Sequence, residues 1–308
     1  MGFDVDMLRY KVCCPDPQYL AEYTASSPFE TPEKVRTVLG DLRFPAPSNQ
    51  RPYLFGCMVL SFDGKMGFAD NPEGTLISKY NLADPRGAKI DFWMLNVCRC
   101  YADAVILGTG TLQARMDKLW FADISDPELL AARPALGRKT PYPLSVISSL
   151  DGKDIPFKHM IFQMRDAPLI MTSLSGAAYI QSRLDCPSEV ITEPRELCRS
   201  DSSIRILAAG EKTADMDALL RLLRQSGISY VSVEAPGYIW ALLQNGRLDE
   251  YLLNYSGVMA GGNTALGCGA PFSLEHHPHV KLLSVGYTEG FLFTRQKLIY
   301  DFESGDSL

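Results

Sequence analysis

The chain has 308 residues, enough for one large domain or two small ones with a sizeable core. Its composition, 46% hydrophobic and 21% charged, is that of an ordinary globular protein. A net charge of −6 argues against a nucleic-acid-binding protein, which usually has a basic face, and no apolar run approaches the roughly 18 residues of a membrane helix. The acidic start, Met1 to Asp6, lacks the basic segment of a secretory signal, so we expect a cytoplasmic protein with no membrane partner.

Residues 1–50 are expected to form an N-terminal extension rich in proline. One helix is predicted there over residues 31–39, because Thr31 can cap it, Pro32 suits the first helical position and Gly40 follows its end. From residue 51 to 308 strands alternate with helices. The predicted strands are 53–61, 104–107, 143–148, 159–163, 169–172, 204–208, 230–233, 251–256 and 290–300, the last as an edge hairpin strand. The predicted helices are 81–101, capped by Asn81 or Asp84, then 175–184, 215–225 and 238–244. This alternation predicts an α/β domain with a mostly parallel central sheet flanked by helices, and with antiparallel strands at the C-terminal end.

One predicted strand ends in a carboxylate. Glu234 directly follows strand 230–233, and Ala235-Pro236-Gly237 then leads into the next helix. Ligands of open α/β sheets bind at such carboxyl ends of strands, and a helix N-terminus offers free N–H groups to an anion. A partly buried glutamate has a raised carboxyl pKa and can serve as an acid or a base. The alternative is that Glu234 only caps the helix.

Other strands end in hydroxyl or glycine residues. Ser61-Phe62-Asp63-Gly64-Lys65 could contact a ligand, or could be a hairpin turn with a solvated lysine. In Gly108-Thr109-Gly110-Thr111 the glycines permit close backbone approach and the threonines can bind phosphate oxygens, although a tight strand-to-helix turn would look the same. Ser148 and Ser149, with Lys153 nearby, suit a ribose 2′-phosphate or form a polar loop. Thr172 is a weaker candidate of the same kind, and a glycine-rich turn spans residues 257–264.

We expect no metal site. The eight cysteines are scattered without a C-x-x-C pair, which indicates reduced thiols. The histidines from His276 to His279 are interrupted by a proline and have no carboxylate partners, so we interpret them as a surface loop. No Ser–His–Asp or Cys–His arrangement can be named.

Taken in order, these segments resemble the reductase domain of bacterial riboflavin biosynthesis, the RibD C-terminal family, which has the dihydrofolate reductase fold. The resemblance covers roughly residues 50–302. Its motifs are matched by residues 61–65, by Asp103-Ala-Val-Ile-Leu-Gly108-Thr-Gly110-Thr111, by Glu234-Ala235-Pro236, by Arg247-Leu-Asp249-Glu250 and by residues 257–262.

The resemblance implies an NADPH-dependent reductase that transfers hydride to a small heterocyclic substrate such as a ribosylaminopyrimidine, and a homodimer. Lys65 and Glu234 would be the catalytic residues, with Lys65 binding or polarising the substrate and Glu234 positioning it or assisting proton transfer. The implied substrate-binding residues are Ser61, Asp63, Lys65 and Glu234. The implied cofactor-binding residues are Gly108, Thr109, Gly110, Thr111, Ser148, Ser149, Thr172 and Gly237.

Two departures from the family pattern leave alternatives open. The riboflavin enzymes usually carry an Asp-Asp-Pro tract after the Gly-Thr turn, where this chain has Leu112-Gln-Ala-Arg115-Met-Asp117-Lys118. Ala235-Pro236 replaces two glycines, and proline lacks an N–H. The first 50 residues are also too short for the zinc deaminase half of the bifunctional enzymes. The chain could therefore be a stand-alone reductase with a different carbonyl or imine substrate, or a degenerate nucleotide-binding member without catalysis.

Overall fold

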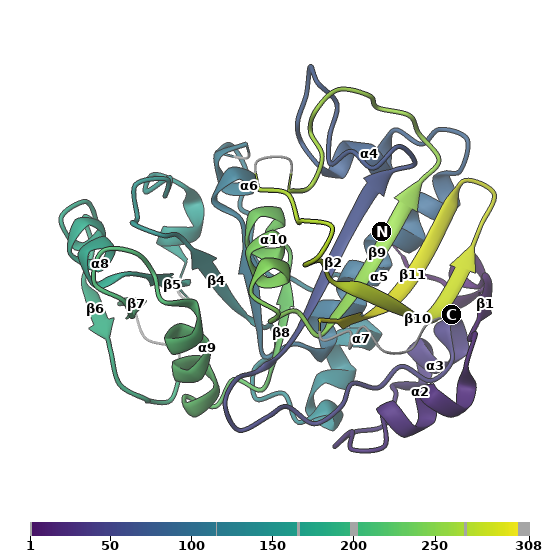
Figure 1. Ribbon diagram of the computed structural model, residues 1–308, viewed down its shortest axis with the longest axis horizontal. Helices are drawn as coiled ribbons and strands as arrows, with labels where there is room; N and C mark the ends of the chain where they lie inside the picture. The colour runs from purple at the N-terminus through teal and green to yellow at the C-terminus, as the bar shows by residue number, and fades with distance from the viewer. Residues whose placement is uncertain (1, 115, 165–166, 198–202, 268–269, 301–308) are drawn as a thin grey trace.

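The computed structural model describes residues 2–114, 116–164, 167–197, 203–267 and 270–300. Within these ranges one mixed sheet runs through the molecule, with strand order β1-β10-β11-β9-β2-β8-β3-β4-β5-β7-β6 (Figure 1). The strands are β1 (Lys11–Cys13), β2 (Tyr53–Ser61), β3 (Ala104–Leu107), β4 (Leu144–Ser148), β5 (Leu169–Thr172), β6 (Ser188–Ile191), β7 (Ile204–Ala208), β8 (Tyr230–Val233), β9 (Glu250–Ser256), β10 (His279–Tyr287) and β11 (Phe291–Ile299).

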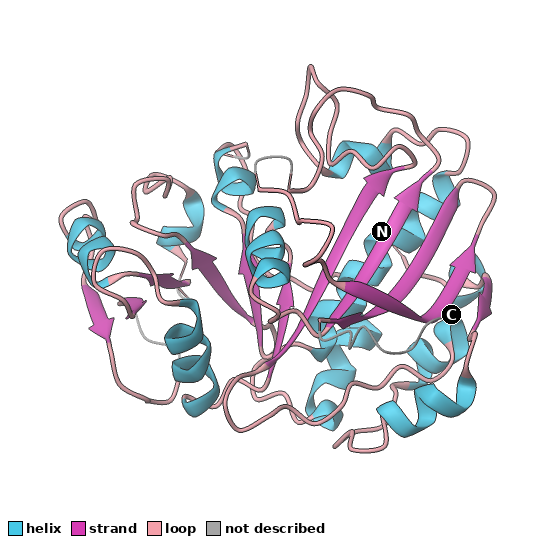
Figure 2. Cartoon of the chain, viewed as in Figure 1, coloured by secondary structure: helices cyan, strands magenta, loops and turns pink. Residues whose placement is uncertain are grey.

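Helices cover both faces of the parallel part of this sheet (Figure 2). The α-helices are α1 (Val5–Leu8), α2 (Pro17–Tyr23), α3 (Glu33–Leu39), α4 (Thr75–Lys79), α5 (Pro85–Tyr101), α6 (Thr109–Gln113), α7 (Pro127–Ala132), α8 (Leu174–Gln181), α9 (Met216–Gln225) and α10 (Pro236–Gln244), and the 3-10 helices are η1 (Arg133–Leu136) and η2 (Met160–Gln163). In the described ranges, no helix combines the length and apolar composition needed to cross a bilayer.

The sheet direction confirms the predicted fold class. The strands from β9 to β6 run parallel to their neighbours, whereas β11, β10 and β1 are added antiparallel. Side chains alternate across β2, so that Phe55 packs in the core beneath α5 while Leu54 packs in the core beneath α9 and α10. The result is two apolar cores separated by the sheet, with the parallel strand ends at a shared edge.

The N-terminal segment is built into this fold. Strand β1 pairs with β10 and extends the sheet, and Leu8, Val35 and Phe44 are fully buried in the core cluster that contains α5. The predicted helix of this segment begins at Glu33, but Thr31 does not cap it. The Thr31 hydroxyl donates instead to the carbonyl of Leu42, 3.0 Å away, which ties the two ends of the helix together.

Two other elements differ from the sequence prediction. Residues 160–163 form the 3-10 helix η2 and not a strand, because the Nδ1 atom of His159 accepts a hydrogen bond from the Ile161 amide and so caps a turn. The C-terminal strand β11 is not at an edge, since it lies between β9 and β10. The short strand β1 occupies that edge. Strand β1 is defined by its pairing with the C-terminal hairpin more than by its own sequence.

Candidate active site

The carboxyl ends of the parallel strands bring the predicted site residues to one edge of the sheet. Adjacent strands β2, β8, β3, β4 and β5 end there at Ser61, Val233, Leu107, Ser148 and Thr172. The segments that follow β8, β3, β4 and β5 therefore lie in a row, with the Gly108–Thr111 turn next to Glu234. Strand β2 continues past the end of β8, since Val233 pairs with Gly56, and Lys65 lies farther along the sheet where β2 ends at Ser61. The amide of Glu234 donates to the carbonyl of Ile106 at 2.9 Å, which fixes β8 against β3 at this point.

Glu234 is held by an arginine that the sequence reasoning missed. Arg99, near the end of α5, donates from Nε and Nη2 to the two carboxylate oxygens of Glu234, at 2.8 and 2.7 Å. Its Nη1 also donates to the side chain of Asp123 at 2.7 Å. The Arg99 side chain is 1% exposed and that of Glu234 is 7% exposed. Burial favours neutral Arg99, but the charges of Glu234 and Asp123 outweigh it and raise the pKa of Arg99 above its ordinary value.

This geometry changes the role expected of Glu234. Its side chain does not cap α10, whose N-cap residue is Ala235, so the helix-cap alternative is wrong. Both carboxylate oxygens already accept a hydrogen bond from a permanent cation, which suits binding and orientation better than proton donation. Each oxygen keeps a lone pair that a ligand N–H or O–H could use.

An aromatic ring lies over this ion pair. The guanidinium carbon of Arg99 is 5.7 Å from the centre of the Trp120 ring, a separation at which cation–π attraction contributes. Trp120 follows, two residues on, the Leu112–Lys118 segment that stands in place of the family's Asp-Asp-Pro tract. Arg115, which the sequence comparison placed in that segment, lies outside the described residues.

The Ser61–Lys65 turn has two different parts. Ser61 is buried, accepts from the Lys65 amide and donates to Asp63 at 2.6 Å. Asp63 also accepts from the amides of Ala260 and Gly261, at 3.0 and 2.8 Å, and these hydrogen bonds with that from Ser61 lower the pKa of Asp63 to about 2. Ser61 and Asp63 therefore hold the glycine-rich loop in place. The Lys65 ammonium, in contrast, has no hydrogen bond or ion pair within the described part of the chain.

The glycine turn after β3 leaves room for a ligand. Thr109 begins α6, and no side chain caps this short helix. A Cβ atom added at Gly110 or at Gly237 would meet nothing within 4 Å, so the backbone is open on both sides of the Glu234 strand end. A Cβ atom at Gly108 would lie 3.5 Å from the Ala235 methyl group, which shows that Ala235 packs on this turn without a clash. Pro236 takes the first helical position of α10, where its missing N–H costs nothing.

The predicted phosphate-binding hydroxyls are joined by a carboxylate. Asp154 accepts from the hydroxyl of Thr109 at 2.7 Å and also from the hydroxyl of Ser149. Lys153, the expected partner of a 2′-phosphate, is exposed and pairs with Asp151 at 2.8 Å. Thr172 is fully buried, and its hydroxyl is an unpaired polar group among the described residues.

One cavity of the described chain lies away from this edge. It occupies about 550 Å³ between the N-terminal segment and β9–β11. The described residues contain no group of three or more His, Cys, Asp or Glu side chains that could hold a metal. His279 begins β10 and does not lie in the predicted surface loop, and Cys198 and Cys268 fall outside the described residues.

The fold and the row of strand-end segments define an α/β protein with its candidate ligand site at the carboxyl edge of a mostly parallel sheet. Comparison with known families specifies this further. The model of the RibD C-terminal domain matches residues 52–287, and the chain belongs to this family, whose members typically are reductases that use NAD(P)H. No curated protein matches the chain.

Solved structures share the fold at low identity. A pyrimidine reductase-like protein from Corynebacterium diphtheriae is 17% identical with a TM-score of 0.59, and the match covers 82% of this chain and 94% of that one. For RibD of Acinetobacter baumannii the values are 19% and 0.53, covering 81% of this chain and 58% of that one. A deaminase/reductase from Thermotoga maritima is 16% identical with a TM-score of 0.53, and the match covers 80% of this chain and 56% of that one. This chain thus corresponds to little more than half of the two longer proteins and to nearly all of the first.

Proposed function

We propose that the chain is an NADPH-dependent reductase that transfers hydride to a small heterocyclic substrate, with a ribosylaminopyrimidine as the nearest candidate. The observation that carries this proposal is the row of strand ends, where the Glu234–Arg99 pair lies next to the open Gly108–Thr111 turn. The neighbouring strand β2 ends in the turn that carries Lys65, whose ammonium has no partner within the described ranges. The protein from Thermotoga maritima is named as a 5-amino-6-(5-phosphoribosylamino)uracil reductase, which supports this substrate class.

The residues present fit a dinucleotide in three respects. Open space at Gly110 and Gly237 admits a ligand close to the backbone, and the first turn of α10 has no side-chain cap to compete with it. Thr172 offers a buried hydroxyl without a partner in the described ranges. The cofactor would supply the hydride, as nicotinamide carriers do. The protein would bind and orient the cofactor and the substrate, and it would exclude water from the site.

Lys65 and Glu234 have separate tasks in this proposal. The Lys65 ammonium, which has no partner among the residues that the structure describes, is a point charge that can bind or polarise a carbonyl or imine of the substrate. Glu234, fixed in place by Arg99, accepts hydrogen bonds from substrate N–H groups and sets the distance between substrate and cofactor. Trp120 gives a heterocycle an aromatic surface beside that carboxylate. The general acid–base role of Glu234 stays a prediction, as do the homodimer and the cytoplasmic location.

The choice of NADPH over NADH rests on the family resemblance. The exposed Lys153 ammonium is already paired with Asp151, and Asp154 is a negative charge between Thr109 and Ser149. A carboxylate near the ribose favours a 2′-hydroxyl, and a cation favours a 2′-phosphate. We therefore expect NADPH to be preferred only modestly.

The test is oxidation of NADPH by the purified protein, followed by absorbance, with the ribosylaminopyrimidine as substrate. Lys65→Met should abolish the substrate-dependent rate, while Lys79→Met, at an exposed lysine of α4, should not change it. Substrate-independent binding of NADPH, measured by thermal shift, should survive in both variants. Binding without turnover of any heterocycle would favour the degenerate nucleotide-binding member, and turnover of a different carbonyl or imine would favour the stand-alone reductase. No binding of either cofactor would refute the proposal.

A further inference from the structure

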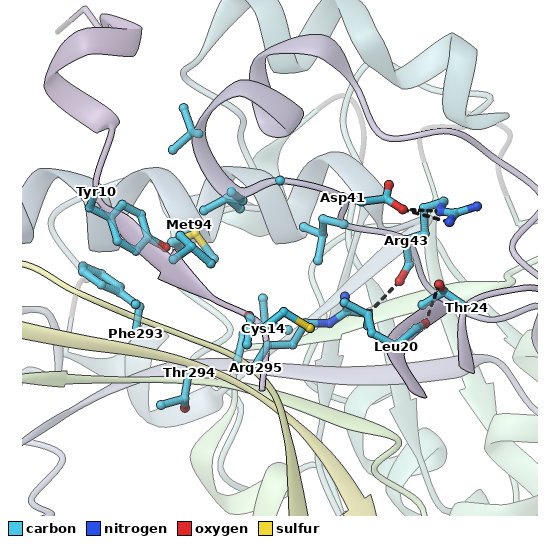
Figure 3. A pocket seen from close by; sticks show the side chains of 18 of the residues that line it. Tyr10, Cys14, Leu20, Thr24, Asp41, Arg43, Met94, Phe293, Thr294 and Arg295 are labelled. Atoms are coloured by element: carbon cyan, nitrogen blue, oxygen red, sulfur yellow. Dashed lines mark hydrogen bonds and ion pairs between the residues drawn. The ribbon is translucent and has the colours of Figure 1, made fainter. Parts of the chain in front are cut away.

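Two cavities of the described chain that lie away from the candidate active site differ in charge. The cavity of about 550 Å³ contains two arginines, and each has a carboxylate partner. Arg43 pairs with Asp41 at 2.8 Å, as Figure 3 shows, and Arg295 pairs with Glu250 at 2.6 Å. The second cavity has a volume of about 210 Å³. Three arginines and one carboxylate line it, and its lining residues are Ser48, Gln50, Arg51, Asp217, Arg221 and Arg247.

The smaller cavity lies at the amino edge of the parallel strands. Arg51 comes just before β2 and Arg247 just before β9, and these two strands are parallel neighbours. Lys65 follows the other end of β2, which has nine residues. At about 3.3 Å per residue, the strand alone separates this cavity from the Lys65 turn by roughly 30 Å. A ligand here would not occupy the candidate active site.

Two of the three arginines are committed to carboxylates, and the third is not. Arg51 donates from Nη1 and Nη2 to Asp249 at 2.6 and 2.7 Å. Arg247 donates from Nε and Nη2 to Asp217 at 2.7 and 3.0 Å. These hydrogen bonds and the charge of Arg247 lower the pKa of Asp217, and the nearby charges of Arg221 and Arg51 add to the effect. Arg221 is exposed and has no hydrogen bond or ion pair among the described residues.

A further cation without a carboxylate lies one turn along the same helix. Arg224 of α9 donates from Nε to the carbonyl of Ser48 at 2.9 Å and from Nη1 to the hydroxyl of Ser229 at 3.4 Å. Residues three apart on a helix are neighbours, so the like charges of Arg221 and Arg224 repel each other. Four arginines and two aspartates, Asp217 and Asp249, leave an excess of two positive charges here, although the net charge of the chain is −6.

Volume and charge narrow the kind of ligand. A cavity of about 210 Å³ is smaller than the roughly 300 Å³ at which sites for drug-sized molecules begin, so it suits one compact group. Guanidinium groups bind oxyanions through charge-assisted hydrogen bonds, and a phosphate group carries up to two negative charges and several acceptor oxygens. The Arg221 guanidinium has five N–H donors to offer, and Nη1 of Arg247 is not used in the pair with Asp217.

We propose that this cavity binds a phosphate dianion, either inorganic phosphate or the terminal group of a phosphate monoester. Arg221 and Nη1 of Arg247 donate to its oxygens, and Arg51 and Arg224 attract it through their charge. Ser48 precedes the RibD C-terminal match, which begins at residue 52, so the anion lies between the N-terminal segment and α9. This site is separate from the proposed reductase site and does not depend on that function.

Titration calorimetry on the full chain at low ionic strength tests the proposal. Methyl phosphate is a dianion at about pH 8, well above a second pKa of about 6, and should bind saturably with a dissociation constant in the millimolar range or below. Dimethyl phosphate carries a single charge and should bind at least about tenfold more weakly. Inorganic phosphate separates the two sources of the group. Tighter binding than methyl phosphate supports a site for free phosphate, and weaker binding supports a site for a monoester.

Matched variants locate the binding site. Arg221→Gln removes the unpaired cation from a partly exposed site and should weaken methyl phosphate binding at least about fivefold, whereas Arg221→Lys keeps the charge and should retain most of the affinity. Arg183 is also exposed, has no carboxylate partner among the described residues and does not line the cavity. Arg183→Gln changes the net charge equally and should bind like the wild type.

Three results would each overturn the proposal. The first is no saturable binding of methyl phosphate or inorganic phosphate, and the second is equal affinity for methyl and dimethyl phosphate. The third is an Arg221→Gln protein that binds methyl phosphate no more weakly than Arg183→Gln does, because the anion would then be held elsewhere on the chain.

Discussion

The Glu234–Arg99 pair gives the sharpest test of the candidate site. Glu234→Gln removes the negative charge that pairs with the buried Arg99, but the amide that replaces the carboxylate keeps one acceptor oxygen. Removing one partner of a buried ion pair usually costs about 3–5 kcal/mol. In this variant Asp123 still neutralises Arg99. The Asp123 side chain is 44% exposed, so solvent partly screens its attraction to Arg99. We therefore expect Glu234→Gln to lower the free energy of unfolding by about 2–3 kcal/mol, at or just below the bottom of that range.

Arg99→Met should cost more, because it leaves the Glu234 carboxylate at 7% exposure with no other cation among its described contacts. We expect a loss of about 3–5 kcal/mol for this variant. The double variant loses both charges together, and its stability should be close to that of Arg99→Met alone. Urea denaturation of the four proteins then gives a coupling energy of about 2 kcal/mol, well above the few tenths expected for independent sites.

The reasoning fails if Glu234→Gln is as stable as the wild type, or if the effects of the two substitutions simply add. Kinetics on the same variants separate the two roles of Glu234. A positioning role predicts a raised KM and a kcat whose pH profile keeps its shape. A general acid–base role predicts a fall in kcat of about 10²–10⁴-fold and the loss of one limb of that profile.

Three further predictions concern neighbouring residues. Asp154→Asn removes the carboxylate beside Ser149 and should tighten NADPH more than NADH, which comparison of the two dissociation constants would check; equal changes would remove Asp154 from the cofactor site. Asp63 has a lowered pKa in the folded state, so its contribution to stability is full above about pH 4 and is lost as the pH falls toward about 2. Asp63→Asn should therefore flatten the acid limb of the stability curve, and an unchanged limb would contradict this. Lys65→Met should leave the free energy of unfolding within about 0.5 kcal/mol of the wild type, measured by urea denaturation, because the described structure gives its ammonium no partner to lose; a larger loss would show a structural role.

The parallel half of the fold could be predicted from the sequence because its signals are local. Strands 104–107 and 230–233 are short apolar runs between helical segments, and α5 and α9 begin at aspartates, Asp84 and Asp215, that accept from amides of the first turn. The antiparallel end lacks such signals. Strand β10 is defined by pairing with β11 across a register shift between Leu282 and Ser284, and an alternating pattern broken by a bulge is not visible in one sequence.

Arg99 shows why the site itself was only half predictable. The strand-end rule located Glu234, but its partner is 135 positions earlier in the chain, on a helix whose register with β8 no local pattern reveals. A signal was nevertheless present in the run Val97-Cys98-Arg99-Cys100-Tyr101. Arg99 is the one charged residue of this run, and the remaining four residues are apolar and buried. A charge that a helix carries into a core requires an opposite charge there, because an unpaired buried ion is too costly. Glu234 is a carboxylate at the end of an apolar strand, and its burial there likewise requires an opposite charge nearby. Once Arg99 and Glu234 are both recognised as buried charges, each therefore predicts that the other is its partner. The coupling energy obtained with the Arg99–Glu234 double variant measures directly whether each charge needs the other.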